Sequence, residues 1–199
     1  MAVVDLHLHT TASDGQLSPT QLVRLLARRG IKTAALTDHD STEGLSEAFE
    51  AAKEFPDLTI IPGIELSADV PGSEIHILGY FFRWQDAEFQ ETLRHFREGR
   101  VIRARGMVGK LHQMGLELRW ERVLELADGG AVGRPHIALA MVEKGFIKDT
   151  KEAFDRYLGR DGPAYVGRMK LSPTDALDLI HQVGGVAVLA HPSWVNDLE

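Results

Sequence analysis

Residues 5–15 read Asp-Leu-His-Leu-His-Thr-Thr-Ala-Ser-Asp-Gly, and this stretch decides how the rest of the chain is interpreted. Its first five residues predict a strand, in which successive side chains alternate between two faces. His7 and His9 therefore project together, while Val4, Leu6 and Leu8 are expected to enter an apolar layer on the other face. Two adjacent imidazoles cost free energy unless something satisfies their nitrogens, and a metal ion would do so. Taken alone, the pair also fits hydrogen-bonded surface histidines on an edge strand.

The composition limits the class of protein. The chain has 199 residues, 44% of them hydrophobic, so one domain with an inserted subdomain is expected. It contains no cysteine, so a metal would be held by nitrogen and oxygen ligands. Without a basic leader or a run of about 18 apolar residues, we expect a cytoplasmic protein that binds no membrane. A net charge of −7 argues against a surface for duplex DNA but leaves room for a small anionic substrate.

Strands and helices alternate along the first 82 residues. A capping box at Ser18 and Gln21, with Pro19 at the first helical position, predicts a helix. The other elements expected here are strands over 31–36, 58–61 and 74–82 and a second helix over 41–55. Such alternation favours an α/β fold, in which a parallel sheet is linked by crossover helices.

Side chains that commonly bind metals recur where these strands end. Those at or just past a predicted strand end are His9, Asp14, His39 and Glu65. Two more, His7 and His76, point inward from within strands. In parallel α/β sheets, ligands bind at the carboxyl ends of the strands. The repetition therefore predicts one site built by successive units.

The middle of the chain changes to a helical pattern. The helices expected there cover 86–114, 120–127, 135–144 and 150–158. We interpret residues 86–170 as a helical subdomain inserted into an α/β domain formed by 1–85 and 171–199. After the insertion, a predicted strand at 186–190 ends at His191, another histidine at a strand end.

In combination, these motifs resemble the PHP (polymerase and histidinol phosphatase) superfamily of metal-dependent phosphoesterases. The motifs are DLHLHTTASDG at 5–15, TDHD at 37–40, GIE at 63–65, EIHILGY at 74–80 and AHP at 190–192. The insertion, with GRPHIA at 133–138, is similar to the branch that acts on nucleoside 3′,5′-bisphosphates and on the 5′ ends of short RNA. The resemblance implies a distorted TIM-like barrel with two or three divalent ions at its rim.

The resemblance also implies a set of metal ligands. His7 and His9 would bind one ion, Asp14 and His39 a second, and His76 and His191 a third, with Glu65 bridging two. The family's final Asp-x-His has no counterpart before Glu199, so we expect a chain truncated before the last strands, or a site with fewer ions. Imidazoles and carboxylates suit manganese, iron or zinc. Clustered ions lower the pKa of a bound water from about 15.7 toward about 7, giving a hydroxide that would attack phosphorus.

Four further residues are expected to support the site. Asp5 and Asp38 each lie near a histidine and can fix its tautomer, although an ordinary hydrogen bond to the backbone fits equally well. Pro135 marks a predicted helix N-terminus, where free N–H groups favour an anion. We expect Arg134 and His136 to hold a second phosphate of the substrate there. Ordinary capping of a surface helix is the alternative.

The sequence therefore predicts a metal-dependent phosphatase, a hydrolase. Its substrate would be a small phosphorylated molecule: a nucleotide, or the 5′ end of a short oligoribonucleotide, as for an exoribonuclease. Two alternatives stay open. One is a histidinol-phosphate phosphatase, against which the GRPHIA insertion counts. The other is a non-catalytic, metal-binding PHP module, if the missing final motif is a true loss. Nothing in the sequence fixes an oligomeric state.

Overall fold

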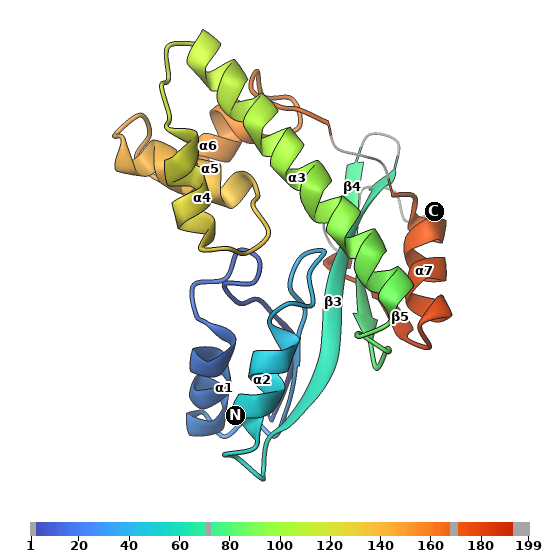
Figure 1. Cartoon of the computed structure of the whole chain (residues 1–199). Coiled ribbons are helices and arrows are strands. Elements are labelled where there is room, and N and C mark those ends of the chain that lie inside the picture. Colours follow the sequence, from blue (N-terminus) through green and yellow to red (C-terminus); the bar gives the residue numbers. More distant parts are fainter. Residues whose placement is uncertain (1–2, 71–72, 168–170, 193–199) are drawn as a thin grey trace. The chain divides into compact units, whose positions relative to one another are not determined.

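The computed structural model describes residues 3–70, 73–167 and 171–192 (Figure 1). The chain divides into two compact units. Residues 1–94 and 170–199 form the first, which holds every described strand, and residues 95–169 form the second, which is helical. Each unit has its own hydrophobic core.

A single sheet lies at the centre of the first unit, with its described strands in the order β1-β2-β3-β4-β5. The strands are β1 (Val4–Leu8), β2 (Thr33–Leu36), β3 (Thr59–Val70), β4 (Ser73–Tyr80) and β5 (Val186–Leu189). Strands β1, β2 and β3 are parallel, as expected, but β4 is antiparallel to both β3 and β5. The prediction of a parallel sheet is therefore wrong at β4. Only two residues separate β3 from β4, and so short a connection permits only antiparallel neighbours.

Strand β3 is much longer than the sequence suggests. The prediction ended it at Ile61 because Pro62 and Gly63 follow, but the strand continues without a break. A Cβ atom on Gly63 would lie 2.4 Å from the carbonyl oxygen of Leu36 in β2, so this glycine permits a close approach of two strands. The extension places Glu65 in the middle of a strand instead of past its end.

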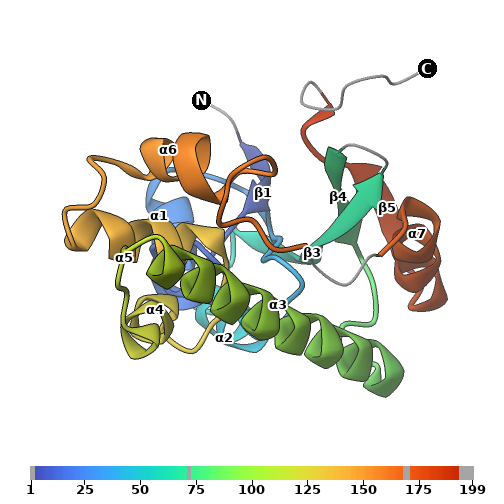
Figure 2. The ribbon, with the colours of Figure 1, turned by 90° about the horizontal axis from the view of Figure 1, so that it is seen from above.

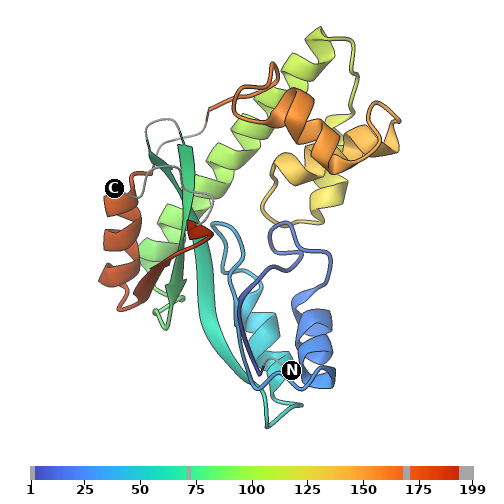
Figure 3. The same cartoon turned by 180° about the vertical axis from the view of Figure 1, so that it is seen from behind.

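Helices cover the outer face of β2 and β3. Helix α1 (Pro19–Arg28) begins at the predicted capping box, where Ser18 and Gln21 exchange hydrogen bonds of 3.2 and 2.9 Å. Its apolar face and that of α2 (Leu45–Ala52) form one core with residues of β2 and β3. Helix α7 (Pro173–Gln182) leads into β5 and lies beside β4 and β5 (Figure 3).

The sheet curls into a half-barrel. The hydroxyl of Tyr80 in β4 donates a hydrogen bond of 2.8 Å to the carbonyl oxygen of Leu6 in β1, although these strands are not neighbours in the sheet. Figure 2 shows β1 and β4 standing opposite each other. Inside the curve, Ala35, Leu78 and Ala190 pack with the ring of Tyr80 in a small apolar cluster. This curled, mixed α/β sheet is consistent with the expected barrel.

The outer face of β1 is not the buried apolar layer that the sequence suggests. Val4 and Leu6 are 48% and 37% exposed, and only Leu8 of this face packs against the core. The reason is that β1 forms one edge of the described sheet. The opposite edge, β5, is similar, since Val186 and Val188 are 55% and 45% exposed.

The second unit contains the later turns of α3 and four shorter elements. The elements are α3 (Ala87–Gln113), α4 (Trp120–Ala127), α5 (Arg134–Glu143), α6 (Thr150–Ala153) and the π-helical turn η1 (Phe154–Leu158). The four predicted helices are confirmed, except that the last widens into η1 after Ala153. Their core includes Met107, Leu111, Ile137, Met141 and Leu158. Among the described residues, none of the helices combines the length and hydropathy that a membrane span requires.

Candidate metal centre

Five histidines and one glutamate, supplied by all five described strands, meet at one edge of the sheet's inner face. They are His7 in β1 and His9 just after it, His39 after β2, Glu65 in β3, His76 in β4 and His191 after β5. Strand β5 runs in the same direction as β1 to β3, so the carboxyl ends of these four strands lie at the same edge. Strand β4 runs in the opposite direction and contributes His76 from its first half.

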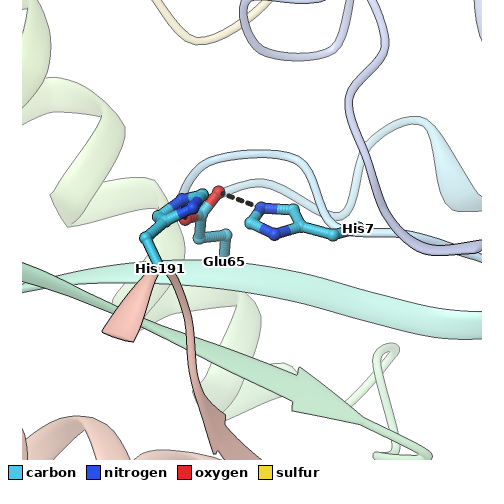
Figure 4. A group of neighbouring side chains, drawn as sticks. All are labelled: His7, Glu65 and His191. Carbon is cyan, nitrogen blue, oxygen red and sulfur yellow. Dashed lines mark hydrogen bonds and ion pairs between the residues drawn. The ribbon is translucent and has the colours of Figure 1, made fainter. Parts of the chain in front are cut away.

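Glu65 is the centre of this group. Its carboxylate is fully buried, and imidazoles from different strands approach it (Figure 4). The nitrogens near Oε2 are Nε2 of His7 at 3.0 Å, Nε2 of His9 at 3.0 Å and Nδ1 of His39 at 3.4 Å. The nitrogens near Oε1 are Nδ1 of His76 at 2.7 Å and Nε2 of His191 at 3.1 Å. A single carboxylate therefore contacts five imidazoles.

The geometry defines two sets of residues that could each hold an ion. In each set, the ligand atoms lie within 4.8 Å of one another: His7, Glu65 and His191 form one set, and His9, His39 and Glu65 form the other. Glu65 belongs to both, which is the position of a bridging ligand. The sets differ from the pairing that the resemblance implies, in which His7 joins His9.

The buried carboxylate and the imidazoles change each other's titration. Burial alone would raise the pKa of Glu65, but hydrogen bonds from His7, His76 and His9 reverse this and hold its pKa well below the usual range. Burial alone would lower the pKa of His9, but hydrogen bonds to Asp14 and Glu65 outweigh it and raise the pKa to about 10. A metal ion would therefore compete with a proton for His9.

This donor set fits a divalent transition metal. A protein core does not gather five imidazoles without a reason, because each buried ring nitrogen needs a partner. The ring centroids of His9 and His39 lie 4.7 Å apart, and those of His7 and His191 4.8 Å apart, so each pair can share one ion. Mixed nitrogen and oxygen donors suit manganese, iron or zinc, whereas calcium sites use oxygen alone.

A tight loop after β1 brings Asp14 to the second set. Asp14 Oδ1 lies 3.3 Å from His9 Nδ1, and its Oδ2 lies 3.8 Å from His39 Nε2. Gly15 closes the loop by donating its N–H to the carbonyl oxygen of Thr10 at 2.9 Å. A Cβ atom at Gly15 would lie 2.3 Å from the carbonyl oxygen of His9, so only glycine fits there. The structure thus brings together all seven predicted metal ligands.

The two acids expected to orient histidines contact other groups. Asp38 accepts hydrogen bonds from Thr10 and Ser13, and its burial raises its pKa although these donors oppose the shift. Asp5 accepts the backbone N–H of His7 at 3.5 Å, which is the ordinary backbone bond that the sequence left open. In these contacts, both acids hold backbone or hydroxyl groups and not imidazole rings.

Three further residues shape the site and were not predicted from the sequence: Thr10, Ser13 and Tyr80. The pKa of Tyr80 is raised to about 12 by burial and by the charge of Glu65, so its hydroxyl stays a hydrogen-bond donor to β1. Thr10 and Ser13 could have been predicted from their position between His9 and Asp14 in the sequence. Ser and Thr in loops often hydrogen-bond to nearby groups, so they can fix the loop that carries a ligand.

Arg134 and His136 lie at the start of α5, in the helical unit. His136 is 4% exposed, and its Nδ1 accepts the N–H of Gly133 at 3.0 Å, so this histidine caps the helix. The guanidinium of Arg134 lies over the ring of Phe154, 5.6 Å from its centroid. His136 thus has the capping geometry that the sequence left open as an alternative.

Known proteins are similar to this chain in sequence and in fold. Residues 5–159 match the PHP domain. The chain is 38% identical over 191 residues to the 5′-3′ exoribonuclease Rnm of Salmonella typhimurium, a match that covers 96% of this chain and 65% of that protein. It is 36% identical over 193 residues to the 3′,5′-nucleoside bisphosphate phosphatase of Chromobacterium violaceum, covering 96% and 67%.

A solved structure gives the same result for the fold. It is an amidohydrolase from Chromobacterium violaceum with bound sulfate and no metal, and it matches with a TM-score of 0.90 at 35% identity, over 97% of this chain and 68% of that one. The chain spans about two-thirds of the length of the curated relatives it matches. Since the domain match covers most of the chain, from β1 into the helical unit, this protein belongs to the PHP domain family.

Proposed function

We propose that this chain is the metal-binding part of a hydrolase that releases phosphate from nucleoside 3′,5′-bisphosphates or acts on the 5′ end of short RNA. The observation that carries the proposal is the buried carboxylate of Glu65, shared by two sets of imidazoles. The relatives' names supply the substrate class, because one is a nucleoside bisphosphate phosphatase and another a 5′-3′ exoribonuclease.

In this proposal, two or three divalent ions bind to the seven ligands. His7, Glu65 and His191 would hold one ion, and His9, His39, Glu65 and Asp14 would hold another, while His76 lies beside Oε1 of Glu65. When bound, manganese, iron or zinc would make hydroxide available near neutral pH and neutralise phosphoryl oxygens. The chain would fix the positions of these ions because their ligands lie in or just after the strands of one sheet, apart from Asp14 in the loop after β1.

The side chains also set the charge of the loaded site. Two divalent ions bring four positive charges, whereas Glu65 and Asp14 bring two negative ones and the imidazoles are neutral when they ligate. The remaining positive charge would attract a phosphate group. The hydroxyls of Thr10 and Ser13 donate to Asp38, so they are not placed to act as nucleophiles. Water is therefore the nucleophile in this proposal.

Arg134 is our candidate for holding the second phosphate of the substrate. Its guanidinium lies over the ring of Phe154, and a guanidinium has the planar fork of N–H donors that matches a phosphate group bidentately. His136 supports this position by capping α5. The sulfate in the solved relative is a tetrahedral oxyanion, as a phosphate group is, which favours the same class of ligand here.

We also propose that residues 86–170 are an insertion into the α/β domain, and that this domain is part of a distorted TIM-like barrel. In that arrangement, further strands would cover the apolar side chains exposed on β1 and β5. These exposed edges support the view that the complete barrel needs more strands than the five described.

The test compares substrates after metal loading. The protein is stripped with a chelator, loaded with Mn²⁺, and given adenosine 3′,5′-bisphosphate, a 5′-phosphorylated oligoribonucleotide or histidinol phosphate. We expect turnover of the bisphosphate or the oligonucleotide. His39→Ala should abolish it, whereas His181→Ala, which replaces a histidine of α7, should not. Turnover of histidinol phosphate alone would overturn the substrate class, and Mn²⁺ binding without any turnover would indicate a non-catalytic module.

A further inference from the structure

The carboxylate of Asp38 has no part in the chemistry proposed above, yet it is surrounded by donors. Its Oδ1 accepts the backbone N–H of Thr10 at 2.7 Å and the hydroxyl of Ser13 at 2.6 Å, and its Oδ2 accepts the hydroxyl of Thr10 at 2.7 Å. Asp38, Thr10 and Ser13 are at most 3% exposed. Three short hydrogen bonds therefore attach this buried side chain to Thr10 and Ser13.

The donors belong to the loop that carries Asp14. Thr10 begins this loop, and Ser13 immediately precedes Asp14 in it. The amides of Ser13 and Gly15 both donate to the carbonyl oxygen of Thr10, at 3.0 and 2.9 Å, so the loop folds around Thr10. Fixing Thr10 and Ser13 therefore fixes the path of the backbone on which Asp14 stands.

We propose that Asp38 is a positioning residue for the metal centre, which holds the loop of residues 10–15 so that Asp14 faces His9 and His39. The inference rests on the ligand set of the proposed function, and it goes beyond that function by assigning Asp38 a role in metal affinity. A residue that served stability alone would weaken the fold without changing metal affinity selectively. The two roles can therefore be separated.

The first experiment removes one donor and keeps its shape. Thr10→Val leaves Asp38 Oδ2 without the threonine hydroxyl and changes no metal ligand. It also removes the acceptor of the Ala12 N–H, which lies 3.1 Å away in the same loop. The control is Thr42→Val, which changes a threonine that is equally buried and whose hydroxyl accepts a hydrogen bond from Gln90 at 2.7 Å, outside the loop. Mn²⁺ affinity, measured by titration calorimetry on the full chain, should fall about tenfold in Thr10→Val and stay near wild type in the control. Asp38→Asn serves if Thr10→Val does not fold, because Ser13→Ala would also remove a hydroxyl that lies 3.4 Å from both His9 Nδ1 and Asp14 Oδ1.

The second experiment asks whether the effect passes through Asp14. In an Asp14→Ala background, Thr10→Val should cause no further loss of Mn²⁺ affinity, because the loop then has no ligand to position. Equal losses in Thr10→Val and Thr42→Val, or full additivity with Asp14→Ala, would overturn the inference, as would a wild-type chain that binds no Mn²⁺. Mn²⁺ binding with the predicted coupling but without phosphate release would contradict only the proposed function.

Discussion

Replacing Glu65 with glutamine separates the charge of the shared ligand from its shape. The amide is nearly isosteric with the carboxylate, but it carries no charge and keeps a single acceptor oxygen. Because Glu65 belongs to both sets of candidate ligands, one substitution should weaken the binding of two ions.

The magnitude follows from the burial of this carboxylate. Glu65 is fully buried, and removing one partner of a buried charged pair costs about 3–5 kcal/mol. At 1.36 kcal/mol for each factor of ten, Mn²⁺ affinity should fall by about two to four orders of magnitude. The metal-free fold should suffer less, because the amide can still accept from one imidazole and donate to another.

Titration calorimetry of the metal-free variant with Mn²⁺ provides the assay, and thermal unfolding checks that the variant is folded. The control is Glu47→Gln, which alters an exposed carboxylate of α2 that accepts the N–H of Thr20 at 3.0 Å. We expect this control to bind Mn²⁺ as the wild type does. If a folded Glu65→Gln variant kept near-wild-type affinity for its ions, Glu65 could not be the shared ligand.

Three other predictions address titration, the curl of the sheet and substrate contact. The pKa of His9 is about 10 in the metal-free fold against an ordinary 6.5, so its stabilising effect is complete below pH 6.5 and is lost as the pH rises through about 10. Urea unfolding across this range should show a falling free energy of unfolding, and a rise would contradict the assignment. Tyr80→Phe removes the donor to the carbonyl oxygen of Leu6 and should cost about 1–3 kcal/mol by urea unfolding; an unchanged midpoint would show that this bond does not stabilise the curl. Arg134→Lys should raise KM for adenosine 3′,5′-bisphosphate but not for p-nitrophenyl phosphate, since lysine cannot bind phosphate bidentately; equal losses on both would refute the contact.

Local signals were enough to predict the helices. Ser18, Pro19 and Gln21 form a capping box that needs no tertiary contact, and the structure has it as expected. The direction of β4 was harder to predict. Pro62 and Gly63 resemble a strand end, and this hid the fact that β3 continues almost to the start of β4, so the hairpin was not recognised.

The candidate site, too, could be predicted only in part from the sequence. The positions of the histidines at strand ends follow from the chain order, and they led to all seven residues that the structure brings together. Which residues group around each candidate ion depends on the curl of the sheet. The hydrogen bond of Tyr80 that accompanies this curl could not be predicted from the sequence. The partners of Asp38 likewise lie 25 and 28 residues away, and only the fold reveals them.

The most direct test of the shared-carboxylate site is an anomalous difference map from crystals of the Mn²⁺-loaded protein. We expect two peaks that share Glu65, one among His7, Glu65 and His191 and the other among His9, His39 and Glu65. A map without a peak at Glu65, or with manganese bound only elsewhere, would show that Glu65 is not a shared metal ligand.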